Sequence, residues 1–467
     1  MYNYNPFKKQ IGLIELEDLE TLRNIPEGWY IEYKQEIPNG RSIAKSISAF
    51  ANTYGGWLFY GIKESDDGRR VMGALQGIPV AEVAKAEDAI RQAASSLVSP
   101  SPHFETKVIF GDATSALLPE THAVIVVGVP SGSNAPYVHG TGAIYRRVAD
   151  SSEPRPETDR HFLDLLWERG KTRRSNFSKF VKRKPKLAKS EAEVSSLRIL
   201  FFPDPWDEKE ISTKLDFSSF SAFMGDKAHG GVTFDNVFTT RNGFMARHVQ
   251  DNIPTRTLHS WRYYNDCTSE VVLPLSSRWI SDLPEAMLYL KGYEHNKKFL
   301  RKCYETKITG FYLVDLSQTY SIILEIFRRK KALMEAEGLP WNLFFKVQIN
   351  NFWRRVPYVD LEEASLFVEK YGIPLVQNKT AYVPAGSDPD SCWEITAPSA
   401  DEEHPETQLQ VDSTVLFLNV CDAVGLPWEA LGIGKKSDEK RPDALARLLD
   451  LGFRAHQVNS ARIKEDD

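Results

Sequence analysis

Residues 27–64 constrain the fold of this chain more than any other stretch. Near its start, apolar Ile31 and Tyr33 alternate with charged Glu32 and Lys34. Because successive side chains on a strand point to opposite faces, the apolar pair faces a core, and Glu32 and Lys34 share the other face. The pattern predicts a strand that places charged groups at a surface or a cleft.

A helix and a second strand are predicted directly after this strand. A turn at 38–40 precedes Ser42, which can cap a helix. An apolar stripe at helical spacing then follows, formed by Ile43, Ile47, Phe50 and Ala51. Asn52 and the two following glycines end the helix, and the apolar run at 57–62 is typical of a strand covered on both faces. A strand–helix–strand unit of this size indicates an α/β architecture.

Two segments together resemble a known family. EGWYIEYKQ followed by SISAFANTYGGWLFYGI, and further along VPSGSNAPYVHGTGAIYRRVADSS, are similar to the two signatures of the Schlafen-type Alba-like (Schlafen AlbA) domain, a family described as DNA-binding. The resemblance implies an α/β (α+β) nucleic-acid-binding domain over residues 10–170. We expect a basic linker at 171–190 and a larger mixed α/β domain, with a possible sensor or regulatory role, at 191–467.

The resemblance also implies a candidate metal site. Schlafen relatives with RNA endonuclease activity hold a divalent cation, Mg²⁺ or Mn²⁺, with three carboxylates, and Glu27 and Glu32 match the first two in type and spacing. Such hard oxygen ligands hold a cation that polarises a phosphate and activates water. With Lys34 beside them, these two glutamates are the catalytic candidates.

The third carboxylate position falls at or beside Lys63, which has the opposite charge. Glu64 or Asp66 would have to replace it. Because a shift of one residue turns a strand side chain to the opposite face, this replacement requires a bulge or the end of the strand. The metal ligands expected under this hypothesis are Glu27, Glu32 and Glu64. The alternative is that Glu32 and Lys34 form a solvated surface pair.

The IYRR segment offers candidate nucleic-acid contacts. Tyr145 can stack on a base, and Arg146 and Arg147 can bind phosphate through their guanidinium groups. The alternative is a hairpin whose arginines pair with surface acids. His139 precedes this segment and is expected to be a turn residue rather than a catalytic one.

A second candidate contact is the basic run at 169–189. It contains ten lysine or arginine residues and no acidic residue, although the whole chain has a formal net charge of −5. Because the chain is acidic overall, a nucleic-acid site must be a local patch. Lys182, Arg183 and Lys184 are the phosphate contacts that we expect here, with the phenylalanines of the run available for stacking. The alternative is a solvated interdomain linker.

The rest of the chain carries no motif that defines an activity. It alternates strand and helix patterns, with an Asn-Gly hairpin signal at 241–243, an acidic loop expected at 387–406 and a short helix expected at 443–451. It contains neither a phosphate loop nor a paired-glycine fingerprint, an HExxH motif or a serine elbow. The four cysteines lie far apart and indicate neither a zinc site nor a disulfide framework.

The partners and compartment follow from the same observations. No apolar run reaches the length of a membrane span and the N-terminus does not resemble a signal peptide, so we expect no membrane contact and a cytoplasmic protein. The sequence holds a single copy of the Alba-like signatures. Since Schlafen nucleases face two such lobes around nucleic acid, the resemblance implies a homodimer.

Three functional hypotheses remain open. The first is a nucleic-acid-binding protein, with an effector domain coupled to a C-terminal recognition module in stress response or phage defence. The second is a metal-dependent endonuclease acting on RNA of the transfer-RNA type. The third is a transcriptional or ligand-sensing regulator whose C-terminal half binds a protein or a small ligand.

Overall fold

The computed structural model describes residues 4–9, 11–113, 116–148, 153–185, 194–203, 205, 212–226, 234–248, 259–339, 343–395, 405–432 and 444–466. The chain divides into two compact units. Unit 1 comprises Met1–Asn176, and unit 2 comprises Phe177–Pro205 and Ile211–Asp467. Both units contain helices and strands, which confirms the mixed α and β fold class.

The predicted strand–helix–strand forms the centre of unit 1. Strand β1 (Ile31–Lys34) leads through helix α1 (Gly40–Asn52) to strand β2 (Gly56–Tyr60), and β1 pairs with β2 in parallel. The helix starts one turn earlier than its apolar stripe because the side chain of Asn39 accepts a hydrogen bond from the Ser42 amide. The order of these elements agrees with the prediction, but the cap is Asn39 rather than Ser42, which lies inside the helix.

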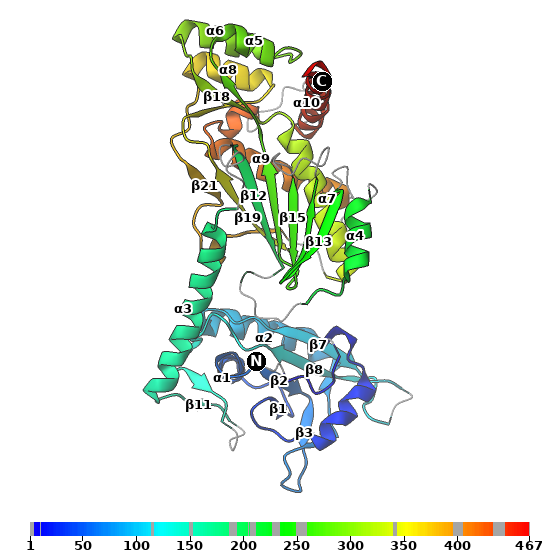
Figure 1. The fold of residues 1–467 in the computed structure, drawn as a ribbon. Coiled ribbons are helices and arrows are strands. Elements are labelled where there is room, and N and C mark those ends of the chain that lie inside the picture. The colour runs from blue at the N-terminus through cyan, green and yellow to red at the C-terminus, as the bar shows by residue number, and fades with distance from the viewer. Residues whose placement is uncertain are drawn as a thin grey trace. The chain divides into compact units, whose positions relative to one another are not determined.

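The main sheet of unit 1 has the order β1-β2-β8-β5, with β7 also pairing with β8. Its further strands are β5 (Ile78–Pro79), β7 (Glu105–Phe110) and β8 (His122–Val129). Helices α1 and α2 (Val80–Leu97) cover one face, and the 3-10 helix η2 (Leu16–Asn24) covers the other (Figure 1). The sheet therefore separates two apolar clusters.

Short elements complete unit 1. They are η1 (Ile11–Leu13), β3 (Ile62–Glu64), β4 (Met72–Leu75), β6 (Val98–Ser99), β9 (Val138–His139), β10 (Tyr145–Arg146) and β11 (Arg155–Pro156). The antiparallel pairs β3–β4, β6–β9 and β10–β11 lie outside the main sheet. They bring the IYRR segment next to α1.

Helix α3 (Arg160–Lys182) runs from unit 1 into unit 2. The expected linker at 171–190 is thus helical as far as Lys182, and residues 186–190 lie outside the described residues. Phe177 and Val181 are buried against Leu200 and Phe202. The phenylalanine and valine side chains that interrupt the basic run therefore anchor the helix.

An eight-stranded sheet forms the body of unit 2. Its order is β13-β14-β15-β16-β12-β19-β21, with β22 also pairing with β19. The strands are β12 (Ser196–Phe202), β13 (Asn236–Thr240), β14 (Gly243–Arg247), β15 (Ser260–Tyr264), β16 (Ser269–Pro274), β19 (Leu343–Asn350), β21 (Thr380–Val383) and β22 (Trp393–Ile395). The predicted Asn-Gly hairpin connects β13 to β14.

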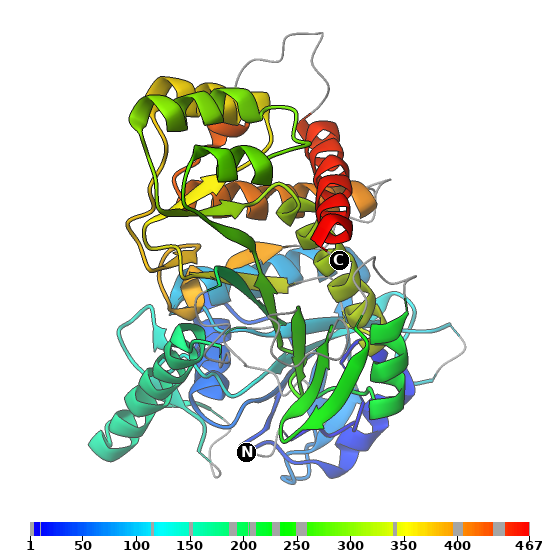
Figure 2. The same ribbon diagram turned by 45° about the horizontal axis from the view of Figure 1, so that its top comes forward.

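Three helices cover one face of this sheet: α4 (Phe217–Gly225), α7 (Thr319–Glu337) and α9 (Pro405–Ala423). The core between them and the sheet is the largest apolar cluster of the chain (Figure 1). Helix α10 (Ala444–Asp466) packs beside α7, as Figure 2 shows for the red helix. It extends well beyond the short helix predicted at 443–451.

A smaller three-stranded sheet belongs to the same unit. Strands β17 (Ser276–Ile280), β18 (Phe311–Asp315) and β20 (Arg355–Tyr358) pack against α5 (Leu283–Tyr289), α6 (Asn296–Thr306) and α8 (Glu362–Tyr371). Two short 3-10 helices, η5 (Pro389–Ser391) and η6 (Trp428–Leu431), complete the described elements.

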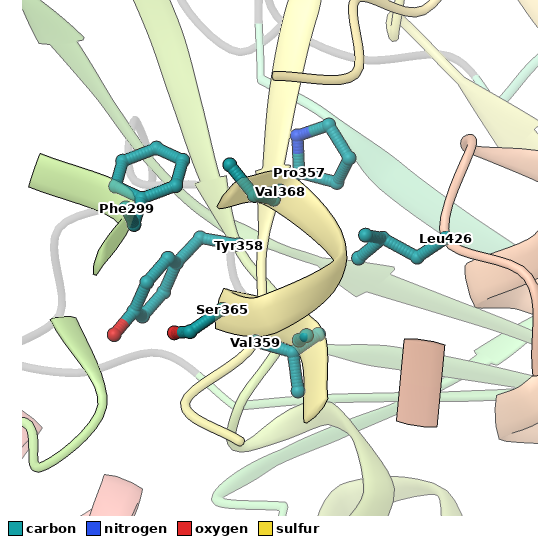
Figure 3. Close-up of a pocket in the computed structure, with 8 residues that line it drawn as sticks. Phe299, Pro357, Tyr358, Val359, Ser365, Val368 and Leu426 are labelled. Atoms are coloured by element: carbon teal, nitrogen blue, oxygen red, sulfur yellow. The ribbon is translucent and has the colours of Figure 1, made fainter. Parts of the chain in front are cut away.

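A small apolar cavity lies beside β20 and α8 (Figure 3). It is lined by Phe299, Pro357, Tyr358, Val359, Ala364, Ser365, Val368 and Leu426. It has room for roughly one water molecule. A cavity of this volume is too small for an organic ligand.

Among the described residues, no helix is both long enough and apolar enough to cross a bilayer.

Candidate nucleic-acid interface

Glu32 lies inside unit 1, with 1% of its surface exposed. Its Oε2 pairs with Nη1 of Arg147 at 2.7 Å, and its Oε1 accepts a hydrogen bond from the Ser46 hydroxyl at 2.9 Å. Nζ of Lys34 lies 3.2 Å from the same Oε1. The alternative of a solvated surface pair is wrong, because the Glu32 carboxylate is buried and both its oxygens are engaged.

Arg147 is fully buried and holds several backbone segments together. Its guanidinium donates to the carbonyls of Gly28 and Ile31 and lies over the Phe50 ring, 4.8 Å from its centroid. Its amide donates to the Thr53 hydroxyl. We predicted a phosphate contact here, but in this conformation no part of the side chain reaches the surface, because the ion pair with Glu32 draws it inward.

Glu27 is also buried, and its environment favours the neutral form. Its Oε1 accepts the Tyr33 amide at 2.7 Å, whereas no described residue donates to or accepts from its Oε2. Burial raises the pKa of Glu27 to about 8, the nearby Glu64 and Glu32 add to this, and the Tyr33 amide and Lys34 oppose it. At neutral pH this carboxyl group is therefore largely protonated.

Lys63 and Glu64 are neighbours on β3, the short strand that follows β2, but they have different surroundings. Strands β3 and β4 shift register between these two residues, and the extra residue on β4 is Gly73, where an added Cβ would lie 2.9 Å from the Glu64 carbonyl oxygen. Lys63 pairs with Asp66 at the surface, at 3.0 Å. Glu64 is half-buried and close enough to act on the pKa of Glu27. The bulge thus lies on β4 and leaves the alternation of Lys63 and Glu64 on β3 unchanged, whereas Glu64 is the last residue of β3, so only the end of the strand meets the condition set by the sequence.

These residues do not fit a divalent cation as they are arranged. Among the described residues, no three His, Cys, Asp or Glu side chains come together in a way that could hold one. Glu32 is neutralised by Arg147 and Lys34, and Glu27 favours its protonated form. A metal needs deprotonated, unpaired oxygens. The cluster of Glu27, Glu32, Arg147 and Lys34 instead holds β1 to the IYRR segment.

Next to this cluster, a half-buried lysine, Lys45, lies over an aromatic ring, with further basic residues on the same domain. Nζ of Lys45 lies 5.5 Å from the centroid of the half-buried Tyr145 ring. Lys45 also pairs with Glu153 at 3.0 Å, so a phosphate would have to displace this carboxylate, as at Arg146. Lys45 and, more weakly, Lys34 lower the pKa of Glu153, and Lys34 is about one-third exposed. Arg41 is exposed on α1 one turn before Lys45. We call Lys34, Arg41, Lys45 and Tyr145 the basic rim of unit 1.

The Asn52 side chain fixes the position of Tyr145 in this rim. Its amide nitrogen donates to the carbonyls of Tyr137 and Tyr145, and its Oδ1 accepts the Tyr137 amide. The Tyr145 ring also meets His139 edge-on at 5.4 Å. His139 lies at the turn, as predicted. A ring held this firmly loses little freedom when a base stacks on it.

Arg146 turns away from the rim. It pairs with Glu157 and lies over the Phe162 ring at 4.8 Å, with about one-third of its side chain exposed. For this residue the structure has the arrangement that we gave as the alternative, a hairpin arginine paired with an acid. The predicted phosphate contact at Arg146 would require that pair to open.

The three basic residues at the end of α3 differ in their surroundings. Lys182 and Lys184 are exposed and form no ion pair with a described residue. Arg183 pairs with the buried Glu270 at 2.6 Å and donates to the Tyr264 hydroxyl. Two of the three predicted phosphate contacts therefore remain available, and the third is partly occupied.

Sequence reasoning missed Arg41 and Lys45. Both lie on the face of α1 opposite its buried stripe, and the same helical periodicity that identified Ile43, Ile47 and Phe50 as core predicts this exposure. What the sequence did not show is the position of the Tyr145 ring, one hundred residues further along, over Lys45.

The fold and this cluster define unit 1 as a small mixed α/β domain whose internal ion pair supports a basic rim. Residues 27–156 match the family model described as Schlafen, AlbA_2. An AlbA_2 domain therefore lies at the N-terminus of the chain, which confirms the predicted resemblance.

The comparisons with other proteins give only distant similarities. The N-terminal domain of a protein from Nitrosomonas europaea, described as related to the ATP-dependent DNA helicase RecG, is 22% identical over 32% of this chain and 97% of that domain, with a TM-score of 0.23. The DIP2311 protein from Corynebacterium diphtheriae is 16% identical over 30% of this chain and 27% of its own, with a TM-score of 0.20. No curated protein sequence matches the chain.

Proposed function

We propose that this protein binds nucleic acid through the basic rim of its AlbA_2 domain. The observation that carries the proposal is the Lys45 ammonium over the Tyr145 ring, with Lys34 and Arg41 nearby on the same domain. Cations next to an aromatic ring can bind phosphates while the ring stacks on a base. The family resemblance, to domains described as DNA-binding, supports the same function.

The test is a binding titration with fluorescent DNA and RNA oligonucleotides, single- and double-stranded, at several salt concentrations. Lys45→Glu should weaken binding about tenfold near 0.1 M salt, and the slope of log K against log salt should fall by about 0.7 to 0.9 per lost phosphate contact. Lys85→Glu on α2 makes the same change of charge in the same unit and is the control for net charge, because Lys85 is exposed and forms no ion pair with a described residue.

The outcome that contradicts the proposal is a similar loss in both variants, since that would show a dependence on net charge alone. A salt-independent affinity would also contradict it.

The metal-dependent nuclease remains a prediction that the geometry of Glu27 and Glu32 does not favour. A cleavage assay on transfer RNA and on DNA with Mn²⁺, Mg²⁺ or chelator decides it. Cleavage that requires metal and disappears in Glu27→Gln would establish the nuclease and show that the cluster rearranges when the substrate binds. The homodimer and the ligand-sensing role of unit 2 likewise remain predictions, and sedimentation at micromolar concentration tests the first.

A further inference from the structure

Over strands β13–β15, no helix among the described residues of unit 2 packs on the second face of the eight-stranded sheet, which we call the open face. Helices α4, α7 and α9 all pack on the other face. The last turns of α3 cover only the part of the open side near β12. We define the open face by the side chains of Phe238, Met245, Arg247, Arg262 and Tyr264.

The strand register places these five side chains on the same side. Phe238 pairs with Met245, which in turn pairs with Arg262 on the next strand. Arg247 and Tyr264 each lie two residues from a member of this row, and residues two apart on a strand share a face. Their neighbours in sequence, Ala246, Trp261 and Tyr263, are buried in the core on the other side.

The open face has an excess of positive charge. On the same side of the sheet, the buried Glu270 of the neighbouring strand β16 is the register partner of Arg262, and it pairs with Arg183 at 2.6 Å and with Arg198 of β12 at 2.5 Å. Arg262 lies 3.9 Å from the same carboxylate, and Arg247 forms no ion pair with a described residue. Three guanidinium groups thus share one carboxylate, and Arg247 adds a fourth positive charge nearby on β14, in a chain whose formal net charge is −5.

The same face presents aromatic rings in fixed orientations. The Tyr264 hydroxyl donates to Glu270 at 2.7 Å and accepts from Arg183 at 2.6 Å, and its ring meets Phe180 edge-on at 5.7 Å. Arg262 lies over the Tyr264 ring, 5.9 Å from its centroid. At the edge of the face, Phe238 is 42% exposed. Phe238 belongs to none of the apolar clusters that the described residues form.

We propose that this open face binds single-stranded nucleic acid, with bases stacked on Phe238 and Tyr264 and phosphates bound by Arg247, Arg262 and Arg183. A single strand presents both the flat faces of its bases and a phosphate at every step, which matches rings interleaved with guanidiniums. A duplex hides its base faces and would use only the arginines. An acidic protein would likewise leave the exposed ring without a specific role.

This site lies in unit 2 and does not depend on the basic rim of unit 1. Its ligand chemistry was not predicted, because the sequence patterns at 236–264 show only a hairpin and a further strand. The arginines that make the face basic come from α3, β12, β14 and β15, and only the sheet register brings them together.

The experiment uses the full-length chain and a 12-mer of uridine or thymidine, with a duplex of the same length beside it. Phe238→Ala should reduce single-strand affinity between about fivefold and a hundredfold. Arg247→Glu should reduce it about tenfold near 0.1 M salt and lower the salt slope by about 0.7. Both side chains are partly exposed and unpaired, so the fold should be retained, which circular dichroism checks.

The matched controls are Leu288→Ala and Lys297→Glu. Leu288 on α5 is 66% exposed and Lys297 on α6 is exposed, so the two changes have the same chemical character elsewhere in unit 2. Photocrosslinking of an oligonucleotide with 5-iodouracil to the unchanged protein gives an independent measurement, and peptides containing Phe238 or Tyr264 should carry the crosslink.

The results separate this inference from the proposed function. If Lys45→Glu abolishes single-strand binding while Phe238→Ala and Arg247→Glu have no effect, the basic rim is the site and the open face is not. If the reverse holds, the open face binds and the proposal for unit 1 fails. Three other results would also overturn the inference. One is a set of crosslinks confined to unit 1, and another is an equal loss of single-strand affinity in the Leu288 and Lys297 controls. The third is binding of duplex or polyglutamate as tight as that of the single strand.

Discussion

Arg147 and Glu32 form an ion pair whose two side chains are almost completely withdrawn from solvent. Removing one member leaves a buried charge without its partner, which typically costs 3–5 kcal/mol. We therefore expect Arg147→Met to lower the free energy of unfolding of unit 1 by about 3 kcal/mol or more. Urea denaturation followed by circular dichroism measures this change.

Two further variants give this prediction its controls. Arg91→Met breaks a surface ion pair with Asp88 and should cost at most about 0.5 kcal/mol. Glu32→Leu combined with Arg147→Met removes both charges, so the double variant should be more stable than Arg147→Met alone. A cost for Arg147→Met no greater than that of Arg91→Met would show that the buried pair contributes little.

Glu27 has a pKa that burial raises from 4.5 to about 8. Folding therefore favours its protonated form, and this contribution to stability is complete below about pH 4.5 and is lost as the pH rises through about 8. In Glu27→Gln this dependence is absent. The free energy of unfolding of the natural protein should thus fall relative to Glu27→Gln by up to about 1.4 kcal/mol per pH unit across this range.

The measurement is a pair of urea titrations at each pH between 5 and 8, since the other titrating groups are common to both proteins and cancel in the difference. A difference that stays constant with pH would mean that Glu27 ionises normally in the folded chain.

Helix α3 contains Gly170, although glycine has a low intrinsic helix propensity. A Cβ at Gly170 would lie 2.2 Å from the Ala135 carbonyl oxygen, so the helix can pass over this segment only without a side chain. Gly170→Ala should therefore destabilise unit 1 by about 1–3 kcal/mol, although alanine favours a helix by about 1 kcal/mol. Thermal unfolding measures the effect.

Gly225 at the end of α4 provides the matched control. A Cβ there would meet nothing within 4 Å, so Gly225→Ala should leave stability unchanged or raise it slightly. Equal effects at the two positions would show that the close approach of α3 relaxes without cost.

Elements with one apolar face could be predicted from the sequence, and elements buried on several sides could not. The alternation in β1 and the stripe of α1 each show a single period, and both elements were located correctly. Helix α9 was missed because most of its surface is buried, and its narrow, less buried side mixes Val411 and Val415 with Asp412 and Asn419, which weakens the contrast between its faces.

The candidate site shows the same limit. The spacing of Glu27 and Glu32 was visible in the chain, but not the ion pair that joins Glu32 to Arg147, because it spans 115 residues. The bulge at Gly73 on β4 follows from the pairing of β4 with β3, which a strand pattern alone does not reveal. What local periodicity determines was predictable, and what depends on distant pairing was not.

At the scale of the whole molecule, the two units have separate cores. The apolar clusters of unit 1 and of unit 2 share no residue among those described. We therefore expect two transitions in differential scanning calorimetry. Gly170→Ala should lower only one of them, and Leu324→Ala, in the core of unit 2, should lower only the other. One transition moved by both variants would contradict this independence.

The open face of the large sheet concentrates positive charge locally in an acidic chain. A net charge of −5 predicts that the protein passes through a cation-exchange column at neutral pH. Retention, however, depends on the patch that meets the resin, and here arginines gather on one surface with a single carboxylate among them. The protein should consequently be retained on heparin or phosphocellulose although its isoelectric point is near 6.1.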